Sequence, residues 1–153
     1  MGELDIRAIR ADQLAATADL RLAMTIELDG VDLDACSPGW RARYASFFGG
    51  LIDAGKGAVF GAYDGALPVG MGAVYQLSNH RSEIYEQPAA FVTHVYVKPA
   101  YRRRGLATLL TKRAVRWAKA QRCVVVRLRP SSFGKAMYES LGFRQSNELE
   151  LEL

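Results

Sequence analysis

Three arginines, a glycine and a small residue stand together in Arg102–Ala107, which reads RRRGLA. The segment follows an apolar run and a proline, and it leads directly into an amphipathic stretch. The first N–H groups of a helix lack internal acceptors and the helix dipole is positive there, so phosphate oxygens can bind at such a position. Gly105 lets the backbone approach a bulky diphosphate, and arginines add charge-assisted hydrogen bonds. The pattern predicts a binding site for a phosphate-bearing anion.

The distribution of charge supports this prediction. The 153 residues include 20 Lys and Arg against 16 Asp and Glu, a formal net charge of +4. Twelve of the basic residues and none of the acidic ones lie between Gln87 and Tyr138, so the remainder holds 8 basic and 16 acidic residues. One segment is therefore expected to face an anion. Arginines beside aromatic residues also suit nucleic acid, but the acidic remainder argues against that class.

Other site chemistries receive no support. The two cysteines, Cys36 and Cys123, and the two histidines, His80 and His94, lack the spacing of a structural zinc site, so we expect free thiols and no metal. No stretch approaches the ~18 apolar residues of a membrane span. The N-terminal residues also lack the apolar run of a signal peptide. We expect residues 1–153 to form one soluble domain in the cytoplasm.

The elements that position the anion segment follow from hydrophobic periodicity and turn residues. Strands are predicted at residues 4–10, 58–63, 67–77, 91–97, 123–128 and 147–153. Helices are predicted at residues 12–28, 40–54 and 105–121, and from Ser131 or Ser132 through Leu141. The order β-α-α-β-β-β-α-β-α-β predicts a mixed α/β domain with one sheet and four helices.

Several local signals set the boundaries. Asp12 is a plausible N-cap of the first helix, residues 29–39 are predicted as a loop, and Asp64-Gly65 suits a tight hairpin turn. Gly142 is expected to end the last helix. An apolar stripe is predicted along the helix that follows the arginines, made of Leu106, Leu109, Leu110, Ala114, Trp117 and Ala118. Cys123 begins an apolar run that indicates a buried strand.

The chain resembles the GCN5-related N-acetyltransferase superfamily. The most specific motif of that family is Gln/Arg-x-x-Gly-x-Gly/Ala between a strand and a helix, and Arg102, Gly105 and Ala107 fill its three defined positions. A second family element, a helix ending in Tyr-Glu-x-Leu-Gly-Phe, matches Tyr138–Phe143, in which Leu141 and Phe143 are expected to be core. The predicted element order agrees with the family's, least specifically over residues 12–54. The resemblance implies an N-acetyltransferase that uses acetyl-CoA as acyl donor.

The resemblance also assigns the cofactor contacts. In the family, acyl-CoA binds where two parallel strands splay apart, which implies that the backbone of Val95, Tyr96 and Val97 pairs with the pantetheine arm. Many relatives carry an Asn seven residues before the tyrosine; Ser131 stands there, and its hydroxyl can still donate one hydrogen bond. Beside Arg102, the pyrophosphate would be held by the backbone N–H groups of Arg103, Arg104, Gly105, Leu106, Ala107 and Thr108.

The family reaction is direct attack of an amine on the thioester in a ternary complex. By resemblance, Tyr138 protonates the leaving thiolate and a backbone N–H near Val95 stabilises the oxyanion. The base stays open, because many relatives place a Glu where this chain has Phe91. His94 suits proton transfer near neutral pH, but a histidine packed on the sheet is the favoured interpretation of this position. Glu27 and a water chain are the other candidates.

The resemblance places the acceptor site in the first two helices and the loop before the cofactor strand. Trp40, Tyr44, Phe47 and Phe48 fit either core or pocket wall, and the acceptor is expected to be a small or peptide amine. A homodimer is possible, and a catalytically silent acyl-CoA-binding module is the alternative function. Acidic residues in this region could attract a cationic amine or form a solvated loop: Glu27, Asp29, Asp32, Asp34, Glu83 and Glu86.

Overall fold

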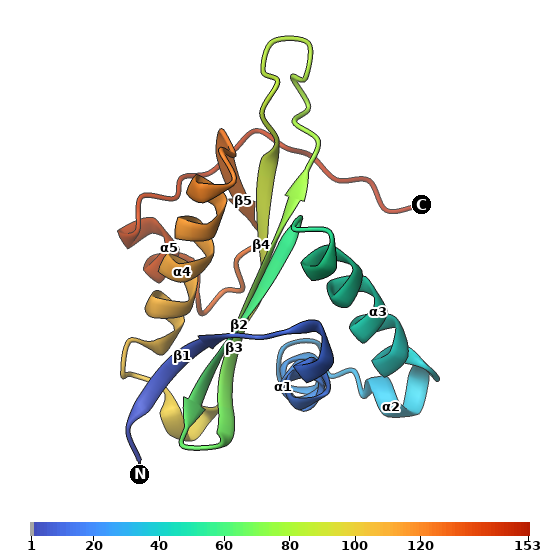
Figure 1. Ribbon diagram of the computed structural model, residues 1–153, viewed down its shortest axis with the longest axis vertical. Helices are drawn as coiled ribbons and strands as arrows, with labels where there is room; N and C mark the ends of the chain where they lie inside the picture. The colour runs from blue at the N-terminus through green and yellow to red at the C-terminus, as the bar shows by residue number, and fades with distance from the viewer. Residues whose placement is uncertain (1) are drawn as a thin grey trace.

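The sheet of the computed structural model, which describes residues 2–153, has five strands in the order β1-β2-β3-β4-β5 (Figure 1). Neighbouring strands are antiparallel except β4 and β5, which are parallel. The mixed α/β class is therefore confirmed. The strands are β1 (Leu4–Ala8), β2 (Gly57–Asp64), β3 (Leu67–Leu77), β4 (Ala89–Val97) and β5 (Val125–Leu128).

Helices cover both faces of the sheet. Helices α1 and α3 lie on one side, and α4 and α5 lie on the other (Figure 1). The α-helices are α1 (Ala15–Asp29), α2 (Leu33–Cys36), α3 (Trp40–Asp53), α4 (Leu106–Ala120) and α5 (Lys135–Ser140). Two short 3-10 helices are η1 (Ala11–Gln13) and η2 (Pro99–Tyr101). Because strand side chains alternate between faces, Val59 and Phe60 of β2 enter different cores, on the α1–α3 side and the α4 side.

Helix α4 packs through a stripe with a four-residue step. Leu106, Leu110, Ala114 and Ala118 are buried against the sheet, and full burial of a leucine such as Leu110 stabilises the fold by about 1.5–3 kcal/mol. The stripe is narrower than the sequence predicted, because Leu109 is 48% exposed. This packing fixes the start of α4 beside the end of β4.

The β2–β3 hairpin is confirmed, with a shift of one residue in its turn. Asp64 still belongs to the ladder, where it pairs with Leu67, so the two loop residues are Gly65 and Ala66. Only Gly65 has a positive φ, +61°. The turn therefore requires glycine at position 65 only. Asp64 has no positive φ and pairs with Leu67 as a strand residue.

The region before β2 differs from its prediction at two points. Asp12 does not cap α1; it lies in η1, and its carboxylate pairs with Arg10 at 3.1 Å. The N-cap of α1 is Leu14, with no side-chain cap. The predicted loop at residues 29–39 contains α2, because the Asp32 carboxylate accepts hydrogen bonds from the Asp34 and Ala35 amides. The Asp32 cap thus supports a helix of four residues, which is too short to show a helical period of apolar residues in the sequence.

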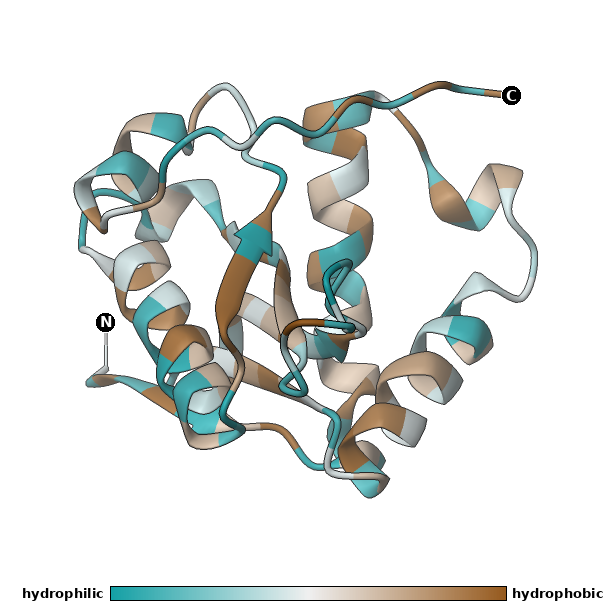
Figure 2. Cartoon of the chain, turned by 90° about the horizontal axis from the view of Figure 1, so that it is seen from above, coloured by the Kyte–Doolittle hydropathy of each residue, from teal (hydrophilic) through white to brown (hydrophobic). Residues whose placement is uncertain are grey.

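The predicted strand at residues 147–153 is wrong, since residues 141–153 contain no strand. Leu149 is fully exposed and Leu151 is 82% exposed, and Figure 2 shows this segment running along the outside with alternating hydropathy. Glu148 forms an ion pair with Arg127 at 3.2 Å, and Glu150 pairs with Arg129. The polar contacts of this segment are therefore exposed ion pairs, and its leucines lie in solvent.

Strand β5 and helix α5 are shorter than predicted. Cys123 and Val124 precede β5, and Val124 is 45% exposed, so the run forms a short edge strand that is not buried. Helix α5 starts after Gly134 without a side-chain cap, which excludes Ser131 and Ser132 as N-caps. Gly142 follows the helix with φ +91°, as predicted.

Leu141 and Phe143 are half-buried, so they form the margin of the core and not its centre. Cys36 and Cys123 are free thiols, as predicted. Across residues 2–153, no helix combines the length and apolar character needed to span a bilayer.

Candidate active site

Strands β4 and β5 separate halfway along β4. Their parallel ladder runs from Ala89↔Val125 to Val92↔Leu128, whereas β4 continues to Val97. Residues 93–97 therefore have no strand partner on the β5 side within the described chain. Unpaired backbone N–H and C=O groups at such an edge can bind an extended ligand. Val95, Tyr96 and Val97, the predicted pantetheine contacts, all lie in this segment.

A β-bulge marks the same point of β4. Gly72 of β3 stands between the pairs Met71↔Tyr96 and Ala73↔Thr93, so it opposes both His94 and Val95. His94 has φ +54°, which non-glycine residues rarely adopt. Bulges bend a strand and redirect its side chains and amides. The bulge therefore coincides with the start of the splayed segment and sets the orientation of Val95.

The loop before α4 has the backbone form expected of a phosphate site. Arg103 has φ +64° and Gly105, the N-cap, has φ +76°. No atom lies within 4 Å of a Cβ placed on Gly105, so the loop is open to ligand. Within residues 2–153 no protein acceptor meets the Arg103 or Gly105 N–H, and no side chain caps α4. Its first amides, from Leu106 to Thr108, can meet an anion.

The Arg102 side chain turns inward instead of toward the loop amides. Its Nε donates to Val97 O at 2.9 Å, and its Nη1 lies 2.7 Å from Glu27 Oε1. Tyr96 Oη also donates to Glu27, at 2.9 Å. The hydrogen bond from Arg102 and then that from Tyr96 hold the pKa of Glu27 below its usual value, despite some desolvation. The guanidinium therefore ties α1 to the loop.

Arg103 and Arg104 form the exposed basic part of the loop. The Arg104 guanidinium lies 5.7 Å from the centroid of the Tyr101 ring. Tyr101 in turn donates to Asp64 at 2.8 Å, which anchors η2 to the β2–β3 turn. The loop is thus positioned by its contact with the β2–β3 turn. The exposed positive charge of Arg103 and Arg104 lies just after the unpaired segment 93–97 of β4 in the chain.

Tyr138 is buried on α5 and is 9% exposed. Its ring packs edge-on against Phe143, and a Cβ on Gly134 would lie 2.9 Å from it, so that glycine permits the close approach. Burial raises the pKa of Tyr138 to about 12, against a smaller opposing effect of the Thr111 hydroxyl on α4. The phenol is therefore protonated at neutral pH and can donate a hydrogen bond. Ser131 lies in the turn that leads to α5, where its carbonyl accepts from Gly134 N.

His94 packs between aromatic rings on the other face of β4. Its ring centroid lies 6.2 Å from that of Tyr44 and 5.4 Å from that of Phe48. Its Nδ1 is buried and meets no hydrogen-bond partner in the described chain. Burial, and then the charge of Arg21, lower the pKa of His94 to about 3. The imidazole is therefore neutral at pH 7 and holds a proton only weakly.

A pocket of about 360 Å³ opens beside His94, on the α1–α3 side of β4. It is lined by the four aromatic residues of α3 for which the sequence left open a role in the core or in a pocket wall. Trp40, Tyr44 and Phe48 are also buried in the core, whereas Phe47 is 51% exposed. The two roles therefore coexist. Its lining residues are Arg21, Leu33, Ser37, Trp40, Arg43, Tyr44, Phe47, Phe48, Tyr75, Thr93 and His94.

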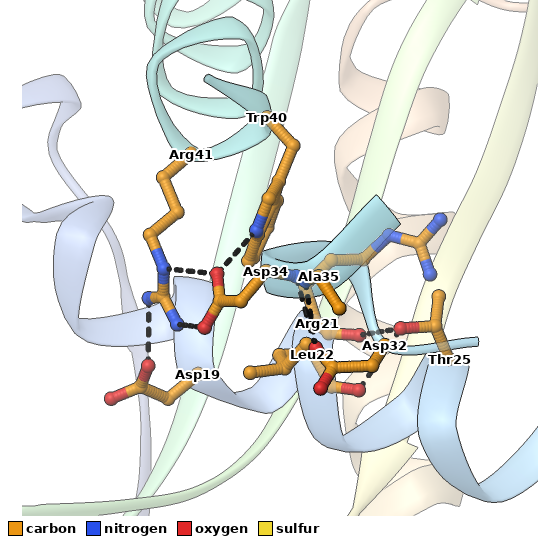
Figure 3. A network of polar contacts seen from close by, with 9 residues as sticks. All are labelled: Asp19, Arg21, Leu22, Thr25, Asp32, Asp34, Ala35, Trp40 and Arg41. Atoms are coloured by element: carbon orange, nitrogen blue, oxygen red, sulfur yellow. Dashed lines mark hydrogen bonds and ion pairs between the residues drawn. The ribbon is translucent and has the colours of Figure 1, made fainter. Parts of the chain in front are cut away.

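The acidic residues of this region lie outside the pocket. Asp34 accepts from Trp40 Nε1 at 2.7 Å and pairs with Arg41, which also contacts Asp19 at 2.7 Å (Figure 3). Asp32 caps α2. Glu83 and Glu86 are exposed on the β3–β4 loop. None of the six acidic residues predicted near the acceptor lines the pocket.

Sequence reasoning missed Arg21 and Arg43 as pocket residues. The predicted stripe of the first helix used residues 14, 18, 22 and 26, but Ile26 is 48% exposed. The buried residues of α1 include Thr17 and Met24, so Arg21, four residues after the first and three before the second, faces inward. Polar residues at positions 17, 21 and 25 were the available signal for a helix face that borders a site.

The chain is similar to known proteins in sequence and in fold. A family model described as "Acetyltransferase (GNAT) family" matches residues 25–143. Aminoglycoside N(6')-acetyltransferase type 1 of Acinetobacter haemolyticus is 35% identical over 65 residues, which are 40% of this chain and 45% of that protein. The matched part thus spans less than half the length of that relative.

Two solved structures have the same fold at low sequence identity. A predicted acetyltransferase from Clostridium acetobutylicum, solved with acetyl-CoA, has a TM-score of 0.85 at 18% identity and covers 98% of this chain and 96% of its own. A GCN5-related N-acetyltransferase from Ralstonia eutropha JMP134 has a TM-score of 0.83 at 18% identity, covering 99% of both chains.

Proposed function

The chain belongs to the acetyltransferase (GNAT) family, and from that premise we propose that it transfers an acetyl group from acetyl-CoA to an amine in a ternary complex. The observation that carries the proposal is the continuity of the unpaired segment 93–97 of β4 with the open loop before α4. An extended arm and a diphosphate need these two features in this order.

The cofactor contacts follow from that continuity. The backbone of Val95, Tyr96 and Val97 pairs with the amides of the pantetheine arm. The N–H groups from Arg103 to Thr108 bind the pyrophosphate, with the exposed side chains of Arg103 and Arg104 adding charge. Arg102 contributes by holding the loop, because its guanidinium is engaged by Glu27 and Val97 O. Ser131 remains a proposed contact through its hydroxyl.

The reaction needs one bond to form and one to break. The neutral amine nitrogen attacks the thioester carbon, and the oxyanion is stabilised by the Val95 N–H. The C–S bond then breaks as Tyr138 donates its proton to the sulfur, and solvent returns a proton to the phenolate. Because the pKa of Tyr138 is about 12, the phenol is fully protonated at the start of each cycle.

The proton that the attacking ammonium must lose passes to water in this proposal. His94 is a weak base because its pKa is about 3. Glu27 is likewise a weak base, since Arg102 and Tyr96 stabilise its charged form. Both side chains remain testable as bases, but their surroundings favour solvent as the proton acceptor.

The acceptor class has two lines of support that disagree. The A. haemolyticus relative is by name an aminoglycoside acetyltransferase, which favours a cationic acceptor as the acidic residues suggested. The pocket beside the bulge favours an anionic acceptor, because its only charged lining residues are arginines.

The domain extent of 1–153 and the cytoplasmic location also remain predictions.

The test is release of the CoA thiol from acetyl-CoA in the presence of a panel of amines, with the N-acetyl product identified by mass spectrometry. Acetylation of at least one amine well above the acceptor-free rate is the expected result. Acetyl-CoA binding without thiol release for any amine would contradict the proposal and support the alternative, a catalytically silent acyl-CoA-binding module.

A further inference from the structure

We propose that the acceptor is a small amine that also carries a carboxylate or a phosphate, and that Arg21 and Arg43 bind this anionic group. The inference rests on the proposed acetyl transfer and specifies its second substrate. Its starting point is the charge of the pocket beside the β4 bulge, whose lining includes two arginines and no carboxylate.

Arg21 is half-buried and lacks an anionic partner. Its guanidinium makes no hydrogen bond or ion pair with any residue of 2–153, and Figure 3 shows it extended away from the Asp19–Arg41–Asp34 cluster without a contact. Burial lowers the pKa of Arg21, opposed by the more distant charge of Asp29. A desolvated, unpaired cation is costly to the fold, so a bound anion would give this residue the partner that the protein does not supply.

Arg43 stands on the rim of the same pocket in a fixed orientation. Its Nη1 donates to Pro38 O at 2.9 Å and its Nη2 donates to Ser37 Oγ at 2.7 Å. No carboxylate in the described part of the chain lies within 4.0 Å of it. A guanidinium has five N–H donors, so donors remain for a ligand while the two existing bonds reduce the entropy lost on binding.

The carboxylates of Asp19, Asp34 and Glu27 cannot bind a cation without breaking existing pairs, and no carboxylate lines the pocket. Arg41 neutralises Asp19 and Asp34, and Arg102 neutralises Glu27. A polyamine or aminoglycoside in the pocket would therefore meet two unpaired arginines. Like charges across an interface disfavour such a partner.

The location of Arg21 links anion binding to the reaction. Arg21 lines the same pocket as His94, the bulge residue that precedes Val95. An anionic group bound by Arg21 would therefore lie in the pocket that borders the bulge, next to Val95, whose N–H is proposed to stabilise the oxyanion. The rings of Trp40, Tyr44, Phe47 and Tyr75 supply flat apolar walls, which suit an acceptor with an apolar or aromatic body.

Matched acceptors test the charge preference. Phenylalanine is compared with phenylalaninamide for a carboxylate, O-phosphotyramine with tyramine for a phosphate, and spermidine serves as the polycation. The ratio of kcat/KM within each pair is measured for the wild type, Arg21→Gln and Arg21→Lys. Differences in intrinsic amine reactivity cancel when the ratios of two enzymes are compared.

We expect the anionic member of at least one pair to be preferred, and Arg21→Gln to reduce that preference about tenfold or more. Arg21→Lys should retain part of it. Arg116→Gln removes an exposed charge from the outer face of α4 and should leave the ratio unchanged. If circular dichroism shows that the Arg21→Gln protein is unfolded, the same ratio of kcat/KM is measured for Arg43→Gln.

An unchanged ratio in folded Arg21→Gln, or spermidine as the preferred acceptor, would overturn the inference. Failure of the proposed function has a different outcome, namely no thiol release with any amine. In that case calorimetric titration with phenylalanine and O-phosphotyramine decides: binding that is lost in Arg21→Gln supports anion recognition, and no binding of either compound contradicts it.

Discussion

Arg102 Nη1 lies 2.7 Å from Glu27 Oε1, so one ion pair joins the last turn of α1 to the loop that begins α4. The same guanidinium donates to Val97 O at the end of β4. Helix α1, the proposed cofactor strand β4 and the loop proposed to bind pyrophosphate thus meet at one side chain.

Glu27→Gln should lower the free energy of unfolding at pH 7 by about 1 kcal/mol, because the pair is partly exposed and screened by solvent. The folded pKa of Glu27 is lowered, so its contribution is complete above the unfolded value of about 4.3 and is lost as pH falls through the folded pKa. Urea unfolding from pH 7 to pH 3 measures this. The two proteins should converge in acid, and Glu83→Gln, on an exposed loop, should match the wild type; a constant difference at every pH would refute the assignment.

Gly105→Val should abolish acetyl-CoA binding, because φ +76° strains any L side chain and the new group would stand where the diphosphate approaches. Isothermal titration with acetyl-CoA gives the affinity. Gly55→Val is the matched control, since Gly55 also has a positive φ, +68°, and open space around it, but lies between α3 and β2. Equal binding by both variants would contradict the placement of the pyrophosphate.

Tyr138→Phe should reduce kcat about 100-fold, as loss of a general acid does, and leave acetyl-CoA affinity nearly unchanged. Because the pKa of Tyr138 is about 12, the phenol stays protonated below that pH, and kcat should show no loss from its ionisation up to about pH 10. Steady-state kinetics from pH 6 to pH 10 provide the measurement. Tyr85→Phe, in the exposed β3–β4 loop, should behave as the wild type; an unaltered kcat in Tyr138→Phe would exclude its role as donor.

His94→Gln should flatten the acid dependence of stability. The folded pKa of His94 is about 3, against about 6.5 in the unfolded chain, so between these values the unfolded state binds more protons. Wild-type stability should therefore fall with decreasing pH below about 6.5, by at most about 1.4 kcal/mol per pH unit from this group. Denaturation at pH 4, 5, 6 and 7 gives the slope, with His80→Gln as control. Parallel slopes for wild type and His94→Gln would show that the imidazole is not buried neutral.

Local signals in the sequence were sufficient to place the loop that is proposed to bind the cofactor. Arg102–Ala107 follows a strand and precedes a helix, so its place at a helix N-terminus could be predicted from neighbouring residues alone. The Gly65 turn and the Gly142 helix end were predictable for the same reason, because each depends on a positive φ at one position. The strand expected at residues 147–153 failed, because alternation specifies a strand only where a partner and a covering face exist.

The pocket proposed for the acceptor depended on contacts between distant residues. No spacing along the chain indicates that Glu27 meets Arg102, that Arg41 neutralises Asp19 and Asp34, or that Arg21 and His94 line one pocket. The sequence alone determined where an anion can meet backbone amides, since helix starts and glycine turns are local properties. Only the tertiary structure decided the charge of the pocket, because that charge depends on which acids and bases the packing of α1, α3 and β4 brings together.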